Sequence, residues 1–216
     1  MTTVAVIDYG MGNLRSVCKA IEHVAPGARV RLTADASDIR HADRVVFPGQ
    51  GAIGGCMAAL EANRLRESLL EAMKTKPFLG ICLGLQALYD FSEEGGGTPC
   101  LSLLAGAVKR FPPSMMTDAA SGLPLKVPHM GWNQVRQTAP HPLWQGIPQD
   151  SRFYFVHSYY ADSADARDIA GETEYALRFT SAAAHENIFA VQFHPEKSQR
   201  AGLRLLENFV SWDGAR

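Results

Sequence analysis

A strand, a sharp turn and a helix in immediate succession restrict the fold of this chain more than any other feature. The apolar run 77–81 predicts a short buried strand, and apolar residues at helical spacing follow over 85–89. Cys82 stands at the turn, between Gly80 and Gly84. This arrangement has the form of a nucleophile elbow, with cysteine in place of serine. Taken alone, Gly-x-Cys-x-Gly is more often a buried cysteine in a strand-to-helix turn, so other segments must decide.

The first half of the chain alternates predicted strands and helices. Apolar runs at 4–7, 28–32 and 44–47 predict strands, and the spacing of apolar residues over 14–21 predicts one face of a helix. A second helix is expected from about 57 to 73. This alternation implies a parallel sheet with helices on both faces, and therefore an α/β fold.

Shorter apolar runs follow residue 91 and predict further strands at 106–111, 132–135, 152–156, 175–179 and 188–192. We expect these runs to extend the sheet with antiparallel strands. Between them, the segment 112–128 holds four prolines and predicts a long surface excursion. A final amphipathic pattern predicts a C-terminal helix that includes Leu205 and Phe209.

The composition argues against several classes of function. With 21 basic and 22 acidic residues the net charge is -1, which offers no basic surface to nucleic acid or to an anionic membrane. No apolar run approaches the roughly 18 residues of a membrane span, and no signal peptide is expected. The four cysteines form no CxxC pair, so reduced thiols in a cytoplasmic protein are expected. A length of 216 residues suits a single domain over 1–216.

Three of the predicted strands end in residues suited to a site, at Asp8, at 49–51 and at Cys82. The carboxyl ends of parallel strands meet at one edge of the sheet, which is where sites form. The glycine-rich loop 48–55 can aim backbone N–H groups at an anion, and we interpret it as an oxyanion hole beside Cys82. A phosphate loop is disfavoured because its Lys-Ser/Thr pair is missing. A flexible connection is the structural alternative.

A candidate base follows the last predicted strand. His194 and Glu196 lie just past an apolar run, so the imidazole can take the proton of Cys82 while the carboxylate orients the ring. A satisfied structural histidine is the alternative for His194, and a solvated or helix-start carboxylate is the alternative for Glu196. His129 and His157 are the rival bases.

Three motifs, taken in this order, resemble the class I (triad) glutamine amidotransferases: Pro-Gly-x-Gly, Gly-x-Cys-x-Gly-x-Gln and His-Pro-Glu. The resemblance covers essentially the whole chain. It implies a three-layer, flavodoxin-like α/β fold whose mostly parallel central sheet is extended by antiparallel strands. It also implies that Cys82 is the nucleophile, His194 the general acid and base, and Glu196 the carboxylate that orients His194.

The same resemblance implies binding roles for further residues. The residues expected to supply backbone groups to the oxyanion hole are Gly49, Gln50, Gly51 and Leu83. The residues expected to contact L-glutamine are Gln86, Glu94, Ser158 and Tyr159. No metal and no cofactor are implied. Gln50 departs from the family, because a smaller apolar residue is usual there, and this leaves the detail of the oxyanion loop open.

The segments 7–17, 127–133, 154–159 and 194–198 resemble, more narrowly, the glutaminase subunits of imidazole glycerol phosphate synthase. This implies hydrolysis of L-glutamine to L-glutamate and ammonia for a (β/α)₈-barrel cyclase subunit, bound as a heterodimer, in histidine biosynthesis. Candidates for the surface that faces the cyclase are Asn13, Met130, Trp132 and Lys197. Ordinary packing is the alternative for these residues.

Other readings stay open on the sequence. A triad glutaminase can serve a different synthase, and a thiol hydrolase or protease can share the Cys-His arrangement. A non-catalytic regulatory relative would use the fold as a binding scaffold. The intact Cys82, His194 and Glu196 argue against that last alternative.

Overall fold

A computed structural model describes residues 1–12, 14–117 and 122–215. The strands are β1 (Thr3–Ile7), β2 (Arg29–Thr33), β3 (Arg44–Gly49), β4 (Phe78–Cys82), β5 (Tyr89–Ser92), β6 (Thr98–Pro99), β7 (Leu104–Arg110), β8 (His129–Gln134), β9 (Arg136–Gln137), β10 (Arg152–His157), β11 (Tyr159–Ser163), β12 (Ile169–Tyr175), β13 (Leu177–His185) and β14 (Ile188–Val191). The α-helices are α1 (Leu14–Val24), α2 (Ala36–His41), α3 (Ile53–Ala62), α4 (Arg66–Thr75), α5 (Leu83–Gln86) and α6 (Gln199–Ser211). The 3₁₀ helices are η1 (Glu94–Gly96), η2 (Pro113–Met115), η3 (Pro142–Trp144), η4 (Ala166–Asp168) and η5 (Pro195–Lys197).

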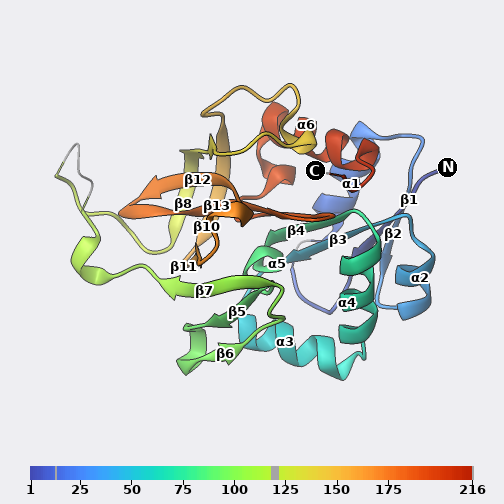
Figure 1. The fold of residues 1–216 in the computed structure, drawn as a ribbon, viewed down its shortest axis with the longest axis horizontal. Helices are drawn as coiled ribbons and strands as arrows, with labels where there is room; N and C mark the ends of the chain where they lie inside the picture. The colour runs from blue at the N-terminus through green and yellow to red at the C-terminus, as the bar shows by residue number, and fades with distance from the viewer. Residues whose placement is uncertain (13, 118–121, 216) are drawn as a thin grey trace.

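A large mixed sheet forms the centre of the molecule (Figure 1), in the order β2-β1-β3-β4-β14-β13-β11-β7-β5-β6. Its first five strands pair in parallel. The strands β13, β11 and β7 then add in antiparallel orientation. The expected fold class is therefore confirmed. Since β3, β4 and β14 are neighbours, their carboxyl ends bring three distant segments of the chain together.

Helices cover both faces of the parallel strands (Figure 1). Successive residues of β1 point to opposite faces of the sheet. Val4 and Val6 pack in one buried cluster with residues of α1 and α6. Ala5 and Ile7 belong to the opposite cluster, which includes buried residues of α2, α3 and α4. The result is a three-layer arrangement in which β4 is buried along its whole length.

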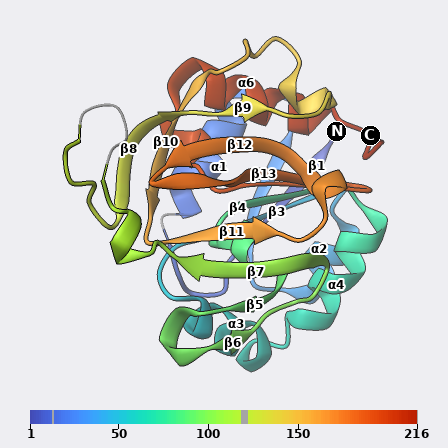
Figure 2. The same ribbon diagram turned by 60° about the vertical axis from the view of Figure 1, so that its left-hand side comes forward.

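Two of the predicted strands leave the large sheet. The runs 132–135 and 152–156 correspond to β8 and β10, which pair with each other as a separate two-stranded antiparallel sheet (Figure 2). The run 188–192 does join the large sheet, but β14 lies parallel to β4 rather than antiparallel. The prediction was wrong on these points because the apolar pattern along a strand determines which of its faces is buried but not which strand pairs with it.

Helix lengths also differ from the prediction. The single helix expected over 57–73 is two helices, α3 and α4, because Arg64 adopts a left-handed φ of 54° between them. The helix after Cys82 is one turn long. Leu88 and Tyr89 are buried as expected, but their backbone pairs with residues 102–104 and Tyr89 begins β5.

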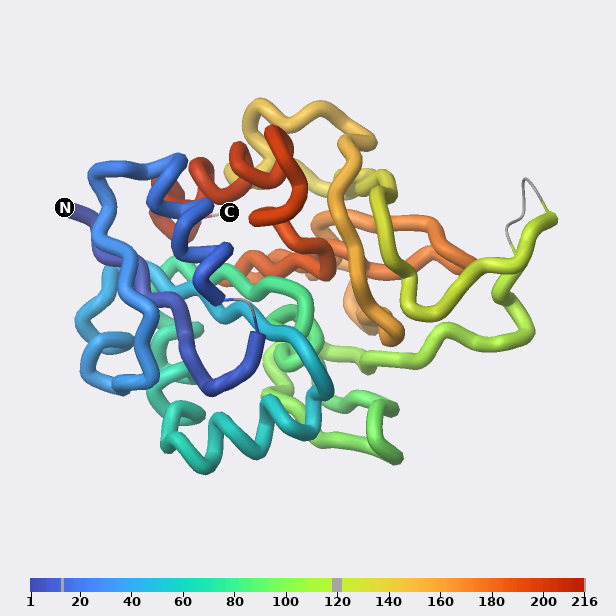
Figure 3. Tube along the Cα trace, turned by 180° about the vertical axis from the view of Figure 1, so that it is seen from behind, coloured from blue at the N-terminus to red at the C-terminus, as the bar shows by residue number. Residues whose placement is uncertain are grey.

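The described parts of the proline-rich segment, 112–117 and 122–128, extend away from the body of the molecule (Figure 3). The two parts meet at an antiparallel bridge between Thr117 and Pro124. This agrees with the predicted surface excursion. In the described part of the chain, no helix has the length and apolar character needed to cross a membrane.

Candidate active site

Cys82 occupies a strained turn between β4 and α5. Its φ of 55° and ψ of -104° lie outside the regions that L-residues favour, and such strain is characteristic of functional positions. The strand behind it is buried and the helix begins at the next residue. The sulfur therefore sits at the apex of a strand-turn-helix elbow, as the sequence predicted.

The two glycines beside the elbow allow β4 and α5 to approach closely. A Cβ added to Gly84 would collide with the carbonyl oxygen of Phe47 on β3. A Cβ on Gly80 would lie 2.9 Å from both the Ala190 Cβ and the Gly84 oxygen. Larger residues at these positions would push the elbow away from its neighbours, so the spacing Gly-x-Cys-x-Gly is a packing requirement.

His194 and Glu196 form a buried pair beside this elbow. The Nδ1 atom of His194 lies 2.9 Å from Oε1 of Glu196, and the two side chains are 2% and 1% exposed. A carboxylate can only accept, so Nδ1 carries the proton and Nε2 is left to face outward from the pair. Nε2 of His194 has no hydrogen-bond partner among the described residues. The imidazole is thus oriented and has a nitrogen available for chemistry.

The charges around His194 favour its protonated form. Burial lowers the pKa of His194, but the negative charge of a Cys82 thiolate and the Glu196 carboxylate oppose this effect and together raise the pKa well above its ordinary value. A thiolate and an imidazolium therefore stabilise one another at this site.

The backbone of β10 holds the His194 segment in place. The His194 N–H donates to the Tyr154 carbonyl at 2.9 Å, and the Tyr154 N–H donates to Oγ of Ser198 at 2.9 Å. The Ser198 hydroxyl donates in turn to the His194 carbonyl at 2.6 Å. The position of the imidazole consequently depends on the two-stranded sheet β8–β10.

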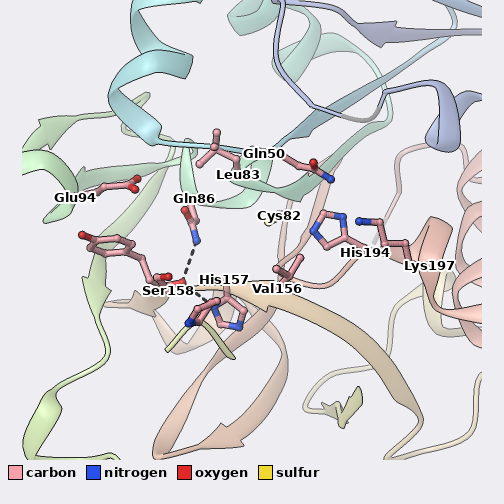
Figure 4. Close-up of a pocket in the computed structure, with 13 residues that line it drawn as sticks. Gln50, Cys82, Leu83, Gln86, Glu94, Val156, His157, Ser158, His194 and Lys197 are labelled. Atoms are coloured by element: carbon pink, nitrogen blue, oxygen red, sulfur yellow. Dashed lines mark hydrogen bonds between the residues drawn. The ribbon is translucent and has the colours of Figure 1, made fainter. Parts of the chain in front are cut away.

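A cavity of about 380 Å³ opens in front of the sulfur, a size suited to a small metabolite. Its lining residues are Gln50, Gly51, Cys82, Leu83, Gln86, Glu94, Pro128, Val156, His157, Ser158, Tyr159, His194 and Lys197. Figure 4 shows His194 and Lys197 at one end of this cavity and Glu94 at the other. The predicted glutamine contacts Gln86, Glu94, Ser158 and Tyr159 thus line the same cavity as Cys82.

The predicted oxyanion residues divide between two places. Gln50, Gly51 and Leu83 line the cavity, with Gly51 at a φ of 97° and Leu83 opening α5. Gly49 does not line it. As the last residue of β3, Gly49 pairs with Cys82 and borders a much smaller recess that His194 and Glu196 also line. A Cβ added to Gly49 would collide with the Tyr9 hydroxyl and the Leu83 side chain.

Glu94 connects the cavity to the helix after the glycine-rich loop. Its Oε2 accepts a hydrogen bond from the Ile53 N–H at 2.8 Å, at the first residue of α3. Ala52 has no side chain able to cap this helix, so Glu94 supplies the missing acceptor from a distant segment. The carboxylate therefore has a fixed position in the cavity.

Gln192 is a residue to which the sequence pattern assigned no role. Its side chain is fully buried, and its Nε2 lies 3.6 Å from the Cys82 sulfur. Its Oε1 accepts from Nε2 of Gln86 at 3.0 Å. One sequence feature could have indicated a role for Gln192: it is a polar residue at the end of an apolar strand, directly before Phe193 and His194.

The rival histidines take no part in the Cys82 elbow. His129 and His157 bond to each other, with 2.9 Å between Nδ1 of His129 and Nε2 of His157. Burial lowers the pKa of His129 to about 4 and, aided by the neighbouring His129, that of His157 to about 3. His157 borders the cavity, but its ring nitrogens are occupied by His129 and the Tyr159 carbonyl.

Three of the predicted interface residues, Met130, Trp132 and Lys197, lie on or against the two-stranded sheet β8–β10. Met130 and Trp132 on β8 are 62% and 43% exposed. Trp132 packs edge-on against Tyr154, with ring centroids 6.1 Å apart, and Nζ of Lys197 lies 5.9 Å from the centre of the same Tyr154 ring. Asn13 lies outside the described residues. Met130 and Trp132 also border a second cavity, of about 520 Å³.

Comparison with known proteins agrees with this fold. Residues 5–212 match the family described as Glutamine amidotransferase class-I. A crystal structure of a glutamine amidotransferase superposes with a TM-score of 0.69 at 13% identity, covering 97% of this chain and 99% of that chain. A glutamine amidotransferase from Thermotoga maritima gives a TM-score of 0.59 at 17% identity, covering 93% of this chain and 78% of that chain. The fold and the family are those of a class I glutamine amidotransferase.

More similar relatives narrow the assignment. The imidazole glycerol phosphate synthase subunit HisH of Aromatoleum aromaticum is 60% identical over 212 residues, which cover 98% of this chain and 99% of that protein. The subunit of the same name from Thiobacillus denitrificans is 59% identical, covering 97% and 91%. The chain belongs to the class I glutamine amidotransferase family, within the group of imidazole glycerol phosphate synthase subunits.

Proposed function

We propose that this chain is the glutaminase subunit of imidazole glycerol phosphate synthase. It hydrolyses L-glutamine to L-glutamate and ammonia, and it delivers the ammonia to a cyclase subunit in the cytoplasmic synthesis of histidine. The observation that carries the proposal is the buried His194–Glu196 pair beside Cys82, at a strained elbow that opens into a cavity. The identity to synthase subunits over nearly the whole chain supports the choice of pathway.

The first half-reaction releases ammonia. The Cys82 thiolate attacks the side-chain amide carbon of glutamine and forms a carbon–sulfur bond. The carbon–nitrogen bond then breaks, and the protonated His194 gives its proton to the departing amine. The products at this stage are ammonia and a γ-glutamyl thioester on Cys82. Glu196 keeps the ring in the tautomer that directs Nε2 toward the sulfur side of the pair.

The second half-reaction regenerates the enzyme. His194, now neutral, takes a proton from water, and the resulting hydroxide attacks the thioester carbon. The carbon–sulfur bond breaks, the new γ-carboxyl group releases its remaining proton to solvent as glutamate leaves, and Cys82 returns to the thiolate beside a protonated His194. The backbone N–H of Leu83, together with one N–H from 49–51, holds the oxyanion in both steps. Loss of one such donor typically lowers the rate by about 10²–10³-fold.

The cavity offers complementary groups to both ends of glutamine. The Glu94 carboxylate, held by the N-terminus of α3, suits the α-amino group. The NH₂ group of Gln86 already donates to the Tyr159 carbonyl and to Gln192, so its free amide oxygen also suits the α-amino group. The backbone N–H groups of Ser158 and Tyr159 suit the α-carboxyl end. This support is geometric, since all four residues line the cavity that Cys82 enters.

The partner we propose is a (β/α)₈-barrel cyclase, bound as a heterodimer. Ammonia from this chain and an open-chain phosphoribulosyl formimino-aminoimidazole-carboxamide nucleotide give imidazole glycerol phosphate and aminoimidazole carboxamide ribotide there. Asn13, Met130, Trp132 and Lys197 are assigned to the docking surface. Exposed methionine and tryptophan suit the centre of an interface, and Lys197 also borders the cavity.

The connection of this surface to His194 suggests how the partner raises activity. Trp132 pairs with Tyr154 across β8 and β10. The Tyr154 carbonyl accepts from the His194 N–H, and the Tyr154 N–H donates to Ser198, so both backbone groups of Tyr154 hold the His194 segment. A cyclase that contacts β8 therefore reaches the catalytic imidazole through one strand. We expect glutamine hydrolysis to be slow in the isolated chain and faster in the liganded complex.

The deciding experiment measures ammonia release from glutamine with the chain alone, with the cyclase, and with the cyclase and its nucleotide. We expect the rate to rise in that order and to vanish in Cys82→Ala in every condition. Candidate synthases of other pathways serve as controls and should yield no aminated product. Equal rates with and without the liganded cyclase would contradict the proposed partner, whereas unchanged ammonia release by Cys82→Ala would contradict the proposed nucleophile.

A further inference from the structure

The amide of Gln192 lies next to the Cys82 sulfur. Its side chain is fully buried and does not line the cavity, so it cannot touch a substrate held there. Its Nε2 is 3.6 Å from the sulfur, a distance that fits an N–H···S hydrogen bond. The residue follows β14, the strand that lies parallel to β4 and its elbow.

The orientation of this amide is fixed by its neighbours. The Tyr159 carbonyl can only accept, so the end of the Gln86 side chain that lies 3.1 Å from it must be the NH₂ group. The same NH₂ group lies 3.0 Å from Gln192, which must present its oxygen there. The other end of the Gln192 amide, the donor, is thereby turned to the sulfur.

A donor aimed at the sulfur favours the thiolate over the thiol. A thiolate has lone pairs for an N–H donor, and a hydrogen bond to a charged group is stronger than one to a neutral group. The other titratable groups near the sulfur are His194, in the segment after β14, and Tyr9, in the segment after β1. Gln192 adds an uncharged donor that does not titrate, from a residue that does not line the cavity.

We propose that Gln192 is a positioning residue that holds the Cys82 sulfur as a thiolate, aimed into the cavity, through a donor fixed by Gln86 and the Tyr159 carbonyl. This rests on the proposed role of Cys82 as nucleophile. Gln192 transfers no proton and makes no bond to glutamine. Its loss should lower kcat and raise the pH at which Cys82 becomes reactive, while KM for glutamine changes little.

The test uses the full chain and follows alkylation of Cys82 by iodoacetamide, located by mass spectrometry, from pH 5 to pH 10. Gln192→Met keeps the length of the side chain and removes the donor. We expect its alkylation midpoint to rise by about one pH unit and kcat in the cyclase complex to fall by about tenfold. Burial raises the pKa of the thiols of Cys18, Cys56 and Cys100 to about 11, about 12 and about 11, so they react later.

Thr173→Val is the matched control. Thr173 is 2% exposed and donates to the Ser181 hydroxyl at 2.8 Å, so the variant also loses one buried hydrogen bond, but away from the sulfur. It should lower the unfolding midpoint without moving the alkylation midpoint. If Gln192→Met keeps the wild-type alkylation midpoint and kcat, the inference is overturned. If Cys82→Ala still hydrolyses glutamine, the proposed role of Cys82 as nucleophile is wrong. That result is distinguishable from an unchanged Gln192→Met, which contradicts only the role of Gln192.

A second measurement does not depend on the variant folding. In the wild-type chain labelled with ¹⁵N, the side-chain amide resonance of Gln192 should shift with pH at the midpoint of Cys82 alkylation. In Cys82→Ala this shift should disappear. A resonance that stays fixed while the thiol titrates overturns the inference.

Discussion

His129 donates its Nδ1–H to Nε2 of His157 across 2.9 Å, and this bond fixes the tautomer of both rings. The direction follows from the Tyr159 carbonyl, which can only accept and lies 2.7 Å from Nδ1 of His157. Nε2 of His157 must then accept, and Nε2 of His129 faces the Asn133 amide at 3.3 Å. The same Tyr159 carbonyl also accepts from Gln86, and His157, but not His129, lines the cavity in front of Cys82.

Acid should destabilise the protein through this histidine pair. Burial lowers the pKa of His129 from 6.5 to about 4 and of His157 from 6.5 to about 3, so the unfolded chain binds more protons between these limits. Stability is therefore full above about pH 6.5 and falls as the pH drops, by on the order of 2 kcal/mol per histidine at pH 5. Urea unfolding from pH 5 to pH 8 measures the slope. His129→Gln should flatten it, whereas His23→Gln, at an exposed position, should not.

Glu196→Gln should lower kcat by about 10²–10⁴-fold, because an amide orients His194 poorly and no longer balances its positive charge. Loss of the carboxylate also lowers the pKa of His194, since Glu196 is one of the groups that raise it. Ammonia release by the cyclase complex measures the effect. Glu207→Gln, on the exposed part of α6, is the control and should retain full activity. Near-normal turnover of Glu196→Gln would remove Glu196 from the mechanism.

Glu94→Gln should raise KM for glutamine by about 10–100-fold with a smaller change in kcat, because a charge-assisted contact to the α-amino group is lost. Glutamine keeps an oxygen that can accept from the Ile53 N–H, so the cap of α3 survives and the charge alone is tested. Steady-state kinetics with glutamine separate the two constants. The adjacent Glu93 bonds to the Arg110 N–H and does not line the cavity, so Glu93→Gln is the matched control. Equal KM values in both variants would argue against this role of Glu94.

Gly84→Ala should destabilise the chain by about 1–3 kcal/mol or more, since overpacking forces the elbow from its neighbours. The added Cβ would collide with the Phe47 carbonyl oxygen, which is backbone and cannot move aside alone. Chemical denaturation gives the free energy of unfolding. Gly27→Ala serves as control because nothing lies within 4 Å of its added Cβ. A Gly84→Ala protein as stable as Gly27→Ala would show that the elbow tolerates a side chain.

Trp132→Ala should weaken binding of the cyclase by about 10–30-fold, the effect expected of a central aromatic residue in an interface. Calorimetric or fluorescence titration with the cyclase measures Kd. Phe91 on β5 is 42% exposed, close to the 43% of Trp132, but lies in another part of the fold. Phe91→Ala should leave Kd unchanged. Equal loss in both variants would point to general destabilisation and away from a docking surface at β8.

Much of the candidate site was predictable because its residues sit in short local patterns. An apolar run followed by Gly-x-Cys-x-Gly leaves few conformations other than the observed elbow. His194 and Glu196 are two residues apart, so their pairing is local and needs no knowledge of distant contacts. Gln192 was missed for the opposite reason. It lies 110 residues from Cys82 in the chain, and no pattern in its own segment predicts that its amide contacts the Cys82 sulfur.

The sequence by itself determined the buried strands, the elbow at Cys82 and the local His194–Glu196 pair, because periodicity, glycine and short spacing act within a few residues. The tertiary structure alone decided which strands are neighbours and which residues surround the sulfur. Placing β3, β4 and β14 side by side brings the glycine-rich loop, Cys82 and the Gln192–His194 segment to one edge. Pairing β8 with β10 joins the exposed Trp132 to the backbone that holds His194. Such relationships depend on burial and hydrogen bonding between distant segments, which no local pattern specifies.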